Sequence, residues 1–193
     1  MNSANKKQFT VGRWAKATFW GWMLGVALIL LLSSFLDSIG IQHMQFYLGV
    51  GMGAGVGFFQ WHLLKKMIAV NTNWIWSTVI GMGVPFVVID LTFPENIAYK
   101  LPLGIAIGSL AVGLLQYFLL KKFSEKAFLW LWGCIAGWTL SVVTVNAIDY
   151  TMRIKVTGYM NLVLALLNLI LILAGGVVLG VISGLAMKRV LED

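Results

Sequence analysis

Polar side chains that could bind a ligand or bond to one another lie within or beside long apolar runs. The five candidates are Gln60, Gln116, Asp90, Asn146 and Asn168. Because a polar group inside a membrane is costly unless it is satisfied, such residues either bond to neighbouring helices or mark a functional site. Gln60 and Gln116 each lie about one helical turn from a lysine pair. They could form a polar constriction in a pathway, but we favour hydrogen bonds between helices.

The other three candidates lie toward the end of the helices opposite the lysine pairs. An acidic residue at membrane depth is by default a functional hypothesis, so Asp90, Asn146 and Asn168 could line an outward-facing polar pocket. Solvation of the helix ends is the simpler explanation, because Pro94 and Glu95 soon follow Asp90 in an expected loop.

Catalytic and cofactor-binding patterns are missing from the sequence. It has no Ser-His-Asp set, no HExxH motif and no Walker A loop. Cys134 is the single cysteine and lies in an apolar run. The two histidines, His43 and His62, lie at opposite ends of one expected helix, about 28 Å apart at 1.5 Å per residue. We therefore expect no enzymatic activity, no metal and no cofactor.

The composition is that of a membrane protein. Hydrophobic residues make up 60% of the 193 residues and charged residues 11%, whereas soluble domains carry about 25% charged residues. The net charge of +7 comes from short basic clusters between apolar runs. Such clusters are typical of membrane topology and not of a surface that binds nucleic acid. We predict one membrane domain, residues 1–193, with the lipid bilayer as its partner.

Six apolar runs are long enough to cross a bilayer as helices. They span about residues 14–36, 44–64, 74–91, 101–120, 128–148 and 160–187. Of the 14 lysine and arginine residues, all but Lys100, Arg153 and Lys155 fall on one side of this arrangement. Because cytoplasmic loops carry the excess of basic residues, we predict that both termini are cytoplasmic.

An internal repeat relates these runs to one another. A shift of 56 residues matches Gln60 with Gln116 and Trp74 with Trp130 without a gap. The sixth run resembles a degenerate third copy, in which Ser183 replaces the glutamine. The sequence thus predicts an all-α, polytopic protein of six transmembrane helices, built as three parallel tandem hairpins. The hairpins span about residues 14–64, 74–120 and 128–187.

Glycines at GxxxG spacing should bring the even-numbered runs together. Gly53 and Gly57 lie on one face of the second run, Gly113 lies in the fourth, and Gly176 and Gly180 lie in the sixth. Small residues let helices approach closely. We expect these three runs to converge on a common axis, inside an outer ring of the three odd-numbered runs.

The odd-numbered runs carry most of the tryptophans. The pattern Trp-x6-Gly-Trp occurs at Trp14–Trp22 and again at Trp130–Trp138, so the first run echoes the fifth. Many of these tryptophans lie near the expected cytoplasmic ends, where indole rings anchor at the level of the lipid headgroups. This placement favours an outer position for the odd-numbered runs.

The repeated unit G-x-x-Q-[WY]-x-x-L-K-K, followed by W-x-W and a glycine, resembles a loose group of small bacterial multi-pass membrane proteins. The unit occurs at Gly57–Lys66 and Gly113–Lys122, and the likeness covers about residues 49–189. The last copy departs from the pattern, because Ser183–Gly184 replaces Gln-Trp. The resemblance implies the bacterial inner membrane as the location and supports the predicted topology. It says nothing about activity, because the group has no settled function.

Two functions of different kinds fit these features. The first is a non-enzymatic module that binds or transports a small or lipophilic molecule. The second is an accessory subunit that docks to a membrane protein partner, or self-associates as a homo-oligomer, through small-residue helix faces. A cavity lined by Asp90, Asn146 and Asn168 would favour the first, whereas a dry core with a flat outer face of small residues would favour the second. We favour the first.

Overall fold

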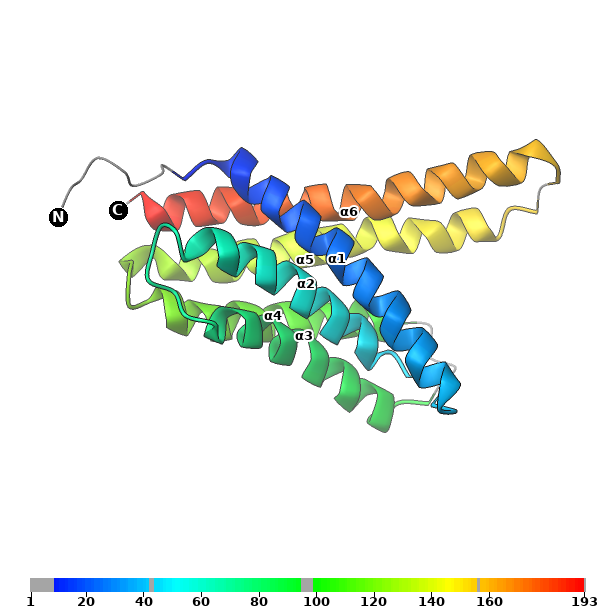
Figure 1. The fold of residues 1–193 in the computed structure, drawn as a ribbon, viewed down its shortest axis with the longest axis horizontal. Coiled ribbons are helices and arrows are strands. Elements are labelled where there is room, and N and C mark those ends of the chain that lie inside the picture. The colour runs from blue at the N-terminus through cyan, green and yellow to red at the C-terminus, as the bar shows by residue number, and fades with distance from the viewer. Residues whose placement is uncertain (1–8, 42–43, 95–98, 156, 193) are drawn as a thin grey trace.

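The computed structural model of the chain is a bundle of α-helices (Figure 1). The structure describes residues 9–41, 44–94, 99–155 and 157–192. Within these residues it contains six long helices and one short 3-10 helix, and the predicted all-α class is confirmed. The helices are α1 (Val11–Ser38), α2 (Phe46–Leu64), α3 (Asn73–Thr92), α4 (Lys100–Leu120), η2 (Glu125–Ala127), α5 (Phe128–Met152) and α6 (Tyr159–Leu191). His43 and Glu95 lie outside the described residues.

Among the described residues, five segments are long and apolar enough to cross a membrane. They are α1, α3, α4, α6 and the continuous η2–α5 segment. α2 is the shortest long helix, with 19 residues. It is not among the five segments, and it contains five glycines, Gln60 and His62, none of which is strongly apolar. The number and length of these apolar helices suggest a multi-pass membrane protein.

Local signals set several of the helix ends. Thr10 caps α1, because its hydroxyl accepts the backbone N–H of Arg13 at 3.3 Å. Ser124 starts η2 in the same way, by accepting the backbone N–H of Lys126 at 3.2 Å. Gly158 precedes α6 with a φ of 65°, a left-handed conformation that favours glycine. These short connections hold consecutive helices antiparallel.

The six helices form a ring. Each helix packs against its neighbours in the chain, and α1 closes the ring against α6. Among the described residues, α2 and α4 barely touch, and neither packs against α6. The expectation that α2, α4 and α6 converge on a common axis is therefore wrong. Each of these helices lies between two odd-numbered helices.

Glycines explain why the ring forms instead of a central core of even-numbered helices. A Cβ atom added at Gly53 would lie 2.7 Å from the carbonyl oxygen of Thr78 on α3, so this face of α2 meets α3. Gly55, on another face, lies against the backbone of Gly21 and Gly25 on α1. α2 thus packs closely against α3 on one side and α1 on the other, and both neighbours are odd-numbered helices.

The remaining predicted packing glycines also contact odd-numbered helices. A Cβ atom at Gly57 would lie 2.8 Å from the hydroxyl oxygen of Thr78, and one at Gly113 would lie 2.8 Å from a methyl carbon of Leu131 on α5. Gly176 and Gly180 of α6 lie against Trp22 and Ala15 of α1. All these glycines make close helix contacts, as predicted, but with odd-numbered helices.

The two ends of the ring differ. Both described chain ends, Phe9 and Glu192, lie at the end that carries Lys65, Lys66, Lys121 and Lys122, which we call the basic end. At the opposite, distal end, the α5–α6 hairpin diverges from the ends of α1 and α3 (Figure 1). α6 continues for 33 residues, so it is the longest described helix.

Burial shows the same divergence. On α1, α2 and α3, buried residues extend close to the distal end, at Leu36, Gly49 and Ile89. Among the residues whose burial the structure describes, the last buried residue on α5 is Val142 and the first on α6 is Gly175. The distal parts of α5 and α6 therefore pack mainly against each other.

Candidate ligand-binding cavity

Trp14, Trp74 and Trp130 meet in the centre of the bundle, toward the basic end. They come from α1, α3 and α5 and are buried. The ring centroid of Trp130 lies 5.6 Å from that of Trp14 and 5.4 Å from that of Trp74, within the range of favourable aromatic contacts. We call these residues the tryptophan cluster. The expectation that the tryptophans lie on an outer ring is wrong for these three, whereas Trp20, Trp76 and Trp132 are exposed.

Gln116 fixes the cluster through two hydrogen bonds. Its carboxamide oxygen accepts the indole N–H of Trp130 at 2.9 Å, and its nitrogen donates to the hydroxyl of Thr78 at 2.9 Å. Gln60 makes the equivalent bond to Thr18 at 3.2 Å. Both glutamines are buried. Gln116 joins α4 to α3 and α5, and Gln60 joins α2 to α1, as the hydrogen-bond interpretation predicts.

Ser183 takes over part of this role in α6. Its hydroxyl accepts the indole N–H of Trp14 at 2.9 Å and donates to the carbonyl of Leu179. Trp74 differs, because its indole N–H is buried without a hydrogen-bond partner among the described residues. The network therefore follows the predicted repeat but is incomplete at one tryptophan.

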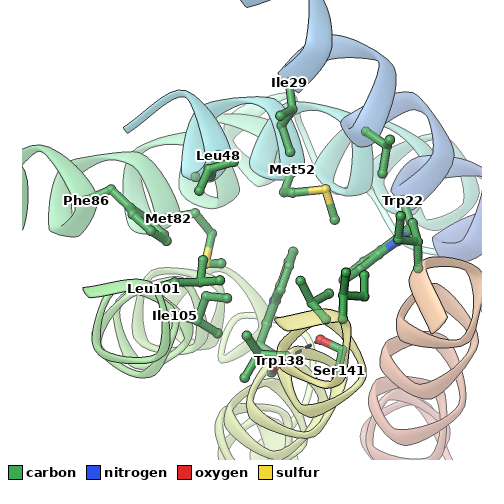
Figure 2. Close-up of a pocket in the computed structure, with 16 residues that line it drawn as sticks. Trp22, Ile29, Leu48, Met52, Met82, Phe86, Leu101, Ile105, Trp138 and Ser141 are labelled. Carbon is green, nitrogen blue, oxygen red and sulfur yellow. Dashed lines mark hydrogen bonds between the residues drawn. The ribbon is translucent and has the colours of Figure 1, made fainter. Parts of the chain in front are cut away.

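A cavity of about 260 Å³ lies between the helices (Figure 2). Its lining residues follow Trp14 and Trp130 along α1 and α5 toward the distal end. All six long helices of the described chain contribute to its wall. The lining residues are Trp22, Val26, Ile29, Leu48, Gly49, Met52, Met82, Phe86, Leu101, Ile105, Trp138, Ser141, Val142, Val145, Ile148 and Ile172. An apolar cavity of about 150 Å³ takes up benzene, so this one has room for a larger apolar molecule.

The wall offers almost no polar contact. Of the residues that line it, only Ser141 has a hydroxyl group, and that group donates to the carbonyl of Trp138 at 2.8 Å. The indole N–H of Trp22 has no partner among the described residues, but its ring packs on Gly175 and Gly176 of α6. None of the described residues that line the cavity is charged. A polar or charged ligand would therefore lose its hydration without compensation.

Asp90 does not line this cavity. Its Oδ2 atom accepts the backbone N–H of Gln45 at 2.6 Å and that of Phe46 at 2.9 Å. These N–H groups lie at the start of α2, so Asp90 of α3 caps the neighbouring helix. A carboxylate at a helix N-terminus satisfies free N–H groups and interacts favourably with the helix dipole.

We expect Asp90→Ala to destabilise the start of α2. Loss of a capping side chain costs about 1 kcal/mol, so the amides of Gln45 and Phe46 should exchange with solvent several-fold faster. Hydrogen exchange followed by mass spectrometry measures this rate. Thr92→Ala is the matched control, because the Thr92 hydroxyl bonds only to Val88 within α3. Equal exchange in both variants would rule out the cap.

Asn146 and Asn168 are also absent from the cavity wall. The hydroxyl of Thr151 on α5 donates to the carboxamide oxygen of Asn168 on α6, which joins the two helices. Asn146 is half-buried on α5. The structure thus does not bring Asp90, Asn146 and Asn168 into one polar pocket, because the α5–α6 hairpin diverges from α3. A role for these residues in binding stays a prediction.

The residues that do line the cavity were not singled out from the sequence, because their apolar side chains look like ordinary core residues. The Trp-x6-Gly pattern in the sequence could have indicated some of these residues. Trp22, Met82 and Trp138 each follow the glycine of the repeated pattern, and all three line the cavity. The rings of Trp22 and Trp138 lie 6.2 Å apart. A large residue at this position in each copy therefore marks the cavity wall.

The cavity can hold an apolar molecule, and the described residues that line it include no acidic, basic, histidine or cysteine side chain. Among the described residues, no group of three or more His, Cys, Asp or Glu side chains could hold a metal ion. Comparisons of the chain with family models, with curated proteins and with solved structures find no match.

Proposed function

We propose that the protein is an integral membrane protein that binds a lipophilic molecule in its central cavity and catalyses no reaction. The observation that carries this proposal is an apolar cavity to which all six described long helices contribute. Its volume of about 260 Å³ is close to the lower end of ordinary ligand pockets, which begin at about 300 Å³. Such a wall selects its ligand by shape and apolarity.

The proposal includes six transmembrane helices, arranged as three parallel tandem hairpins in the bacterial inner membrane. The alternating directions of the helices bring the lysine pairs to one end, which supports a cytoplasmic location for that end and for both termini. α2 is included as the sixth transmembrane helix, because it packs between α1 and α3. The equivalent positions of Trp14, Trp74 and Trp130 support the repeat.

Binding fits the arrangement better than passage of a solute through the centre. The tryptophan cluster and its hydrogen bonds fill the bundle on the basic side of the cavity. A ligand that reaches the cavity from the distal side therefore cannot continue toward the basic end, because the tryptophan cluster blocks the way. The alternative role as an accessory subunit has less support, because the predicted small-residue faces are used inside the bundle, as at Gly53 and Gly180.

Filling the cavity tests the proposal. Val142 lines the cavity and is 5% exposed, whereas its neighbour Val143 faces outward and is 58% exposed. We expect Val142→Phe to exclude a photoreactive alkane from the cavity and to lower its crosslinking there about tenfold, which corresponds to about 1.4 kcal/mol of binding free energy. Mass spectrometry of the crosslinked peptides measures this loss.

Val143→Phe is the matched control and should leave crosslinking inside the cavity unchanged. Near-ultraviolet circular dichroism of the tryptophans shows whether both variants keep the native core. Excess unlabelled alkane should compete with the probe for the cavity but not for the outer surface of the helices. If Val142→Phe and Val143→Phe are labelled alike at the cavity wall, the proposed binding site is excluded.

A further inference from the structure

We infer that the ligand is the hydrocarbon chain of a bilayer lipid, which enters the cavity sideways, past the distal half of the α5–α6 hairpin. This inference rests on the proposed function and adds the class of ligand and its route. It follows from where helix contacts stop, from which side chains lie beside the resulting gaps, and from the shape of the cavity.

Contact between α1 and α6 stops halfway along the bundle. Toward the basic end, Gly180 and Gly176 of α6 pack against Ala15 and Trp22 of α1. Gly175 is the last buried residue of α6 in the distal direction. Both Gly21 and Gly25 of α1 face α2 and not α6, and a Cβ atom at Gly25 would lie 3.0 Å from the Cα atom of Met52. The distal halves of α1 and α6 are therefore not packed together.

The close contacts seen between α4 and α5 lie toward the basic end, where a Cβ atom at Gly113 would lie 2.8 Å from a methyl carbon of Leu131. The thiol of Cys134 on α5 lies 3.6 Å from the carbonyl oxygen of Ser109 on α4. Further toward the distal end, the glycines of α4 face α3, since a Cβ atom at Gly104 would lie 2.7 Å from the ring of Phe86. Figure 1 shows the resulting divergence of the α5–α6 hairpin from α1 and α3.

The cavity reaches the border between α1 and α6 and the border between α4 and α5. Ile29 of α1 and Ile172 of α6 line it beside one gap, and Ile105 of α4 and Val145 of α5 line it beside the other. All four side chains are only partly buried. Because these borders are apolar, a hydrocarbon chain can cross them without losing a polar contact, whereas a hydrated solute would be desolvated. The bilayer is thus the favoured source of the ligand.

The cavity is elongated along α5. Its α5 wall runs from Trp138 through Ser141, Val142 and Val145 to Ile148, which all lie on one helix face. At 1.5 Å per residue this face is about 15 Å long. This apolar face suits an extended hydrocarbon chain better than a compact ring, because an extended chain can contact the α5 wall along its whole length.

Two photoreactive probes separate this inference from the proposed function. The first is a free alkane, and the second is a phospholipid whose acyl chain ends in the same reactive group. The intact protein is reconstituted in nanodiscs of unlabelled phospholipid, each probe is added, and the crosslinked residues are mapped by mass spectrometry. We expect both probes to label Trp138 and Val142 inside the cavity, and Val142→Phe to lower this labelling about tenfold for both.

The outcomes are distinct. If the alkane labels the cavity and the phospholipid labels only outward-facing residues such as Val143, lateral entry of a lipid chain is wrong and the proposed binding function stands. If neither probe labels the cavity, both the binding function and the inference are wrong. Labelling of Val143 by the phospholipid in every variant confirms that the probe reached the protein.

Discussion

Trp130→Ala is expected to lower the free energy of unfolding by about 3–5 kcal/mol, the usual cost of truncating a buried aromatic side chain. Trp130 is 1% exposed, and its ring contacts those of Trp14 and Trp74. The truncation leaves a void at the centre of the ring and also removes the donor to the carboxamide oxygen of Gln116. That oxygen would then stay buried without its partner, which adds to the cost.

Reversible unfolding in mixed detergent micelles, followed by tryptophan fluorescence, measures this loss. Trp132→Ala is the matched control on the same helix, because Trp132 is 65% exposed and its truncation should change stability by only about 0.5 kcal/mol. Similar losses in the two variants would show that Trp130 does not belong to a packed central cluster. Trp130→Phe should fall between them, since it keeps much of the ring but loses the N–H group.

Gly55→Ala is expected to destabilise the bundle by about 3 kcal/mol, at the upper end of the usual range for overpacking. The new methyl group would lie on backbone atoms of Gly21 and Gly25 in α1. A backbone cannot change rotamer to make room, so α1 and α2 would have to move apart along their shared face. This effect outweighs the gain of up to about 1 kcal/mol that alanine brings to a helix.

Gly12→Ala provides a control with the opposite sign. No atom lies within 4 Å of a Cβ atom built at Gly12, so this variant should keep the helix-propensity gain and unfold at the same or a higher temperature. Thermal unfolding in detergent, followed by circular dichroism, measures both variants. An unchanged or higher melting temperature for Gly55→Ala would contradict the close α1–α2 contact.

The sequence predicted the helices better than it predicted their arrangement. Apolar runs bounded by lysine pairs placed every long helix to within a few residues at most ends, although α6 extends to Leu191. The GxxxG stripes correctly indicated close contacts, but a stripe does not state which helix it meets. Gly53 faces α3 and Gly180 faces α1, and only the three-dimensional structure shows this choice.

The tryptophans show a second limit of sequence reasoning. Trp130 and Trp132 are two residues apart and of the same type, yet one is buried in the centre and the other faces outward. Their roles differ because residues two apart on a helix point in different directions. The distance along the chain to a glycine distinguishes them. Trp130 lies seven residues before Gly137, and Trp14 and Trp74 lie seven residues before Gly21 and Gly81.

The candidate site was the least predictable part. The sequence pointed to polar residues as the candidate site, and four of the five (Gln60, Gln116, Asp90 and Asn168) prove to make hydrogen bonds between helices. The cavity depends instead on the missing contacts of the distal half of α5 and α6. A missing contact has no signature in a single sequence, because residues such as Val142 and Ile172 would be equally apolar in a filled core.

The unequal lengths of α2 and α6 have a consequence for the surrounding lipid. α2 has 19 residues, and the apolar run of α6 covers about residues 160–187 before Lys188 and Arg189. These lengths correspond to about 28 Å and about 42 Å of helix at 1.5 Å per residue. A hydrocarbon layer about 30 Å thick matches the first and not the second. Beside α6, where Leu162 and Leu166 are exposed, the helix must tilt or the lipid must stretch. This hydrophobic mismatch gives the protein one thin and one thick flank, and it favours residence where bilayer thickness can vary.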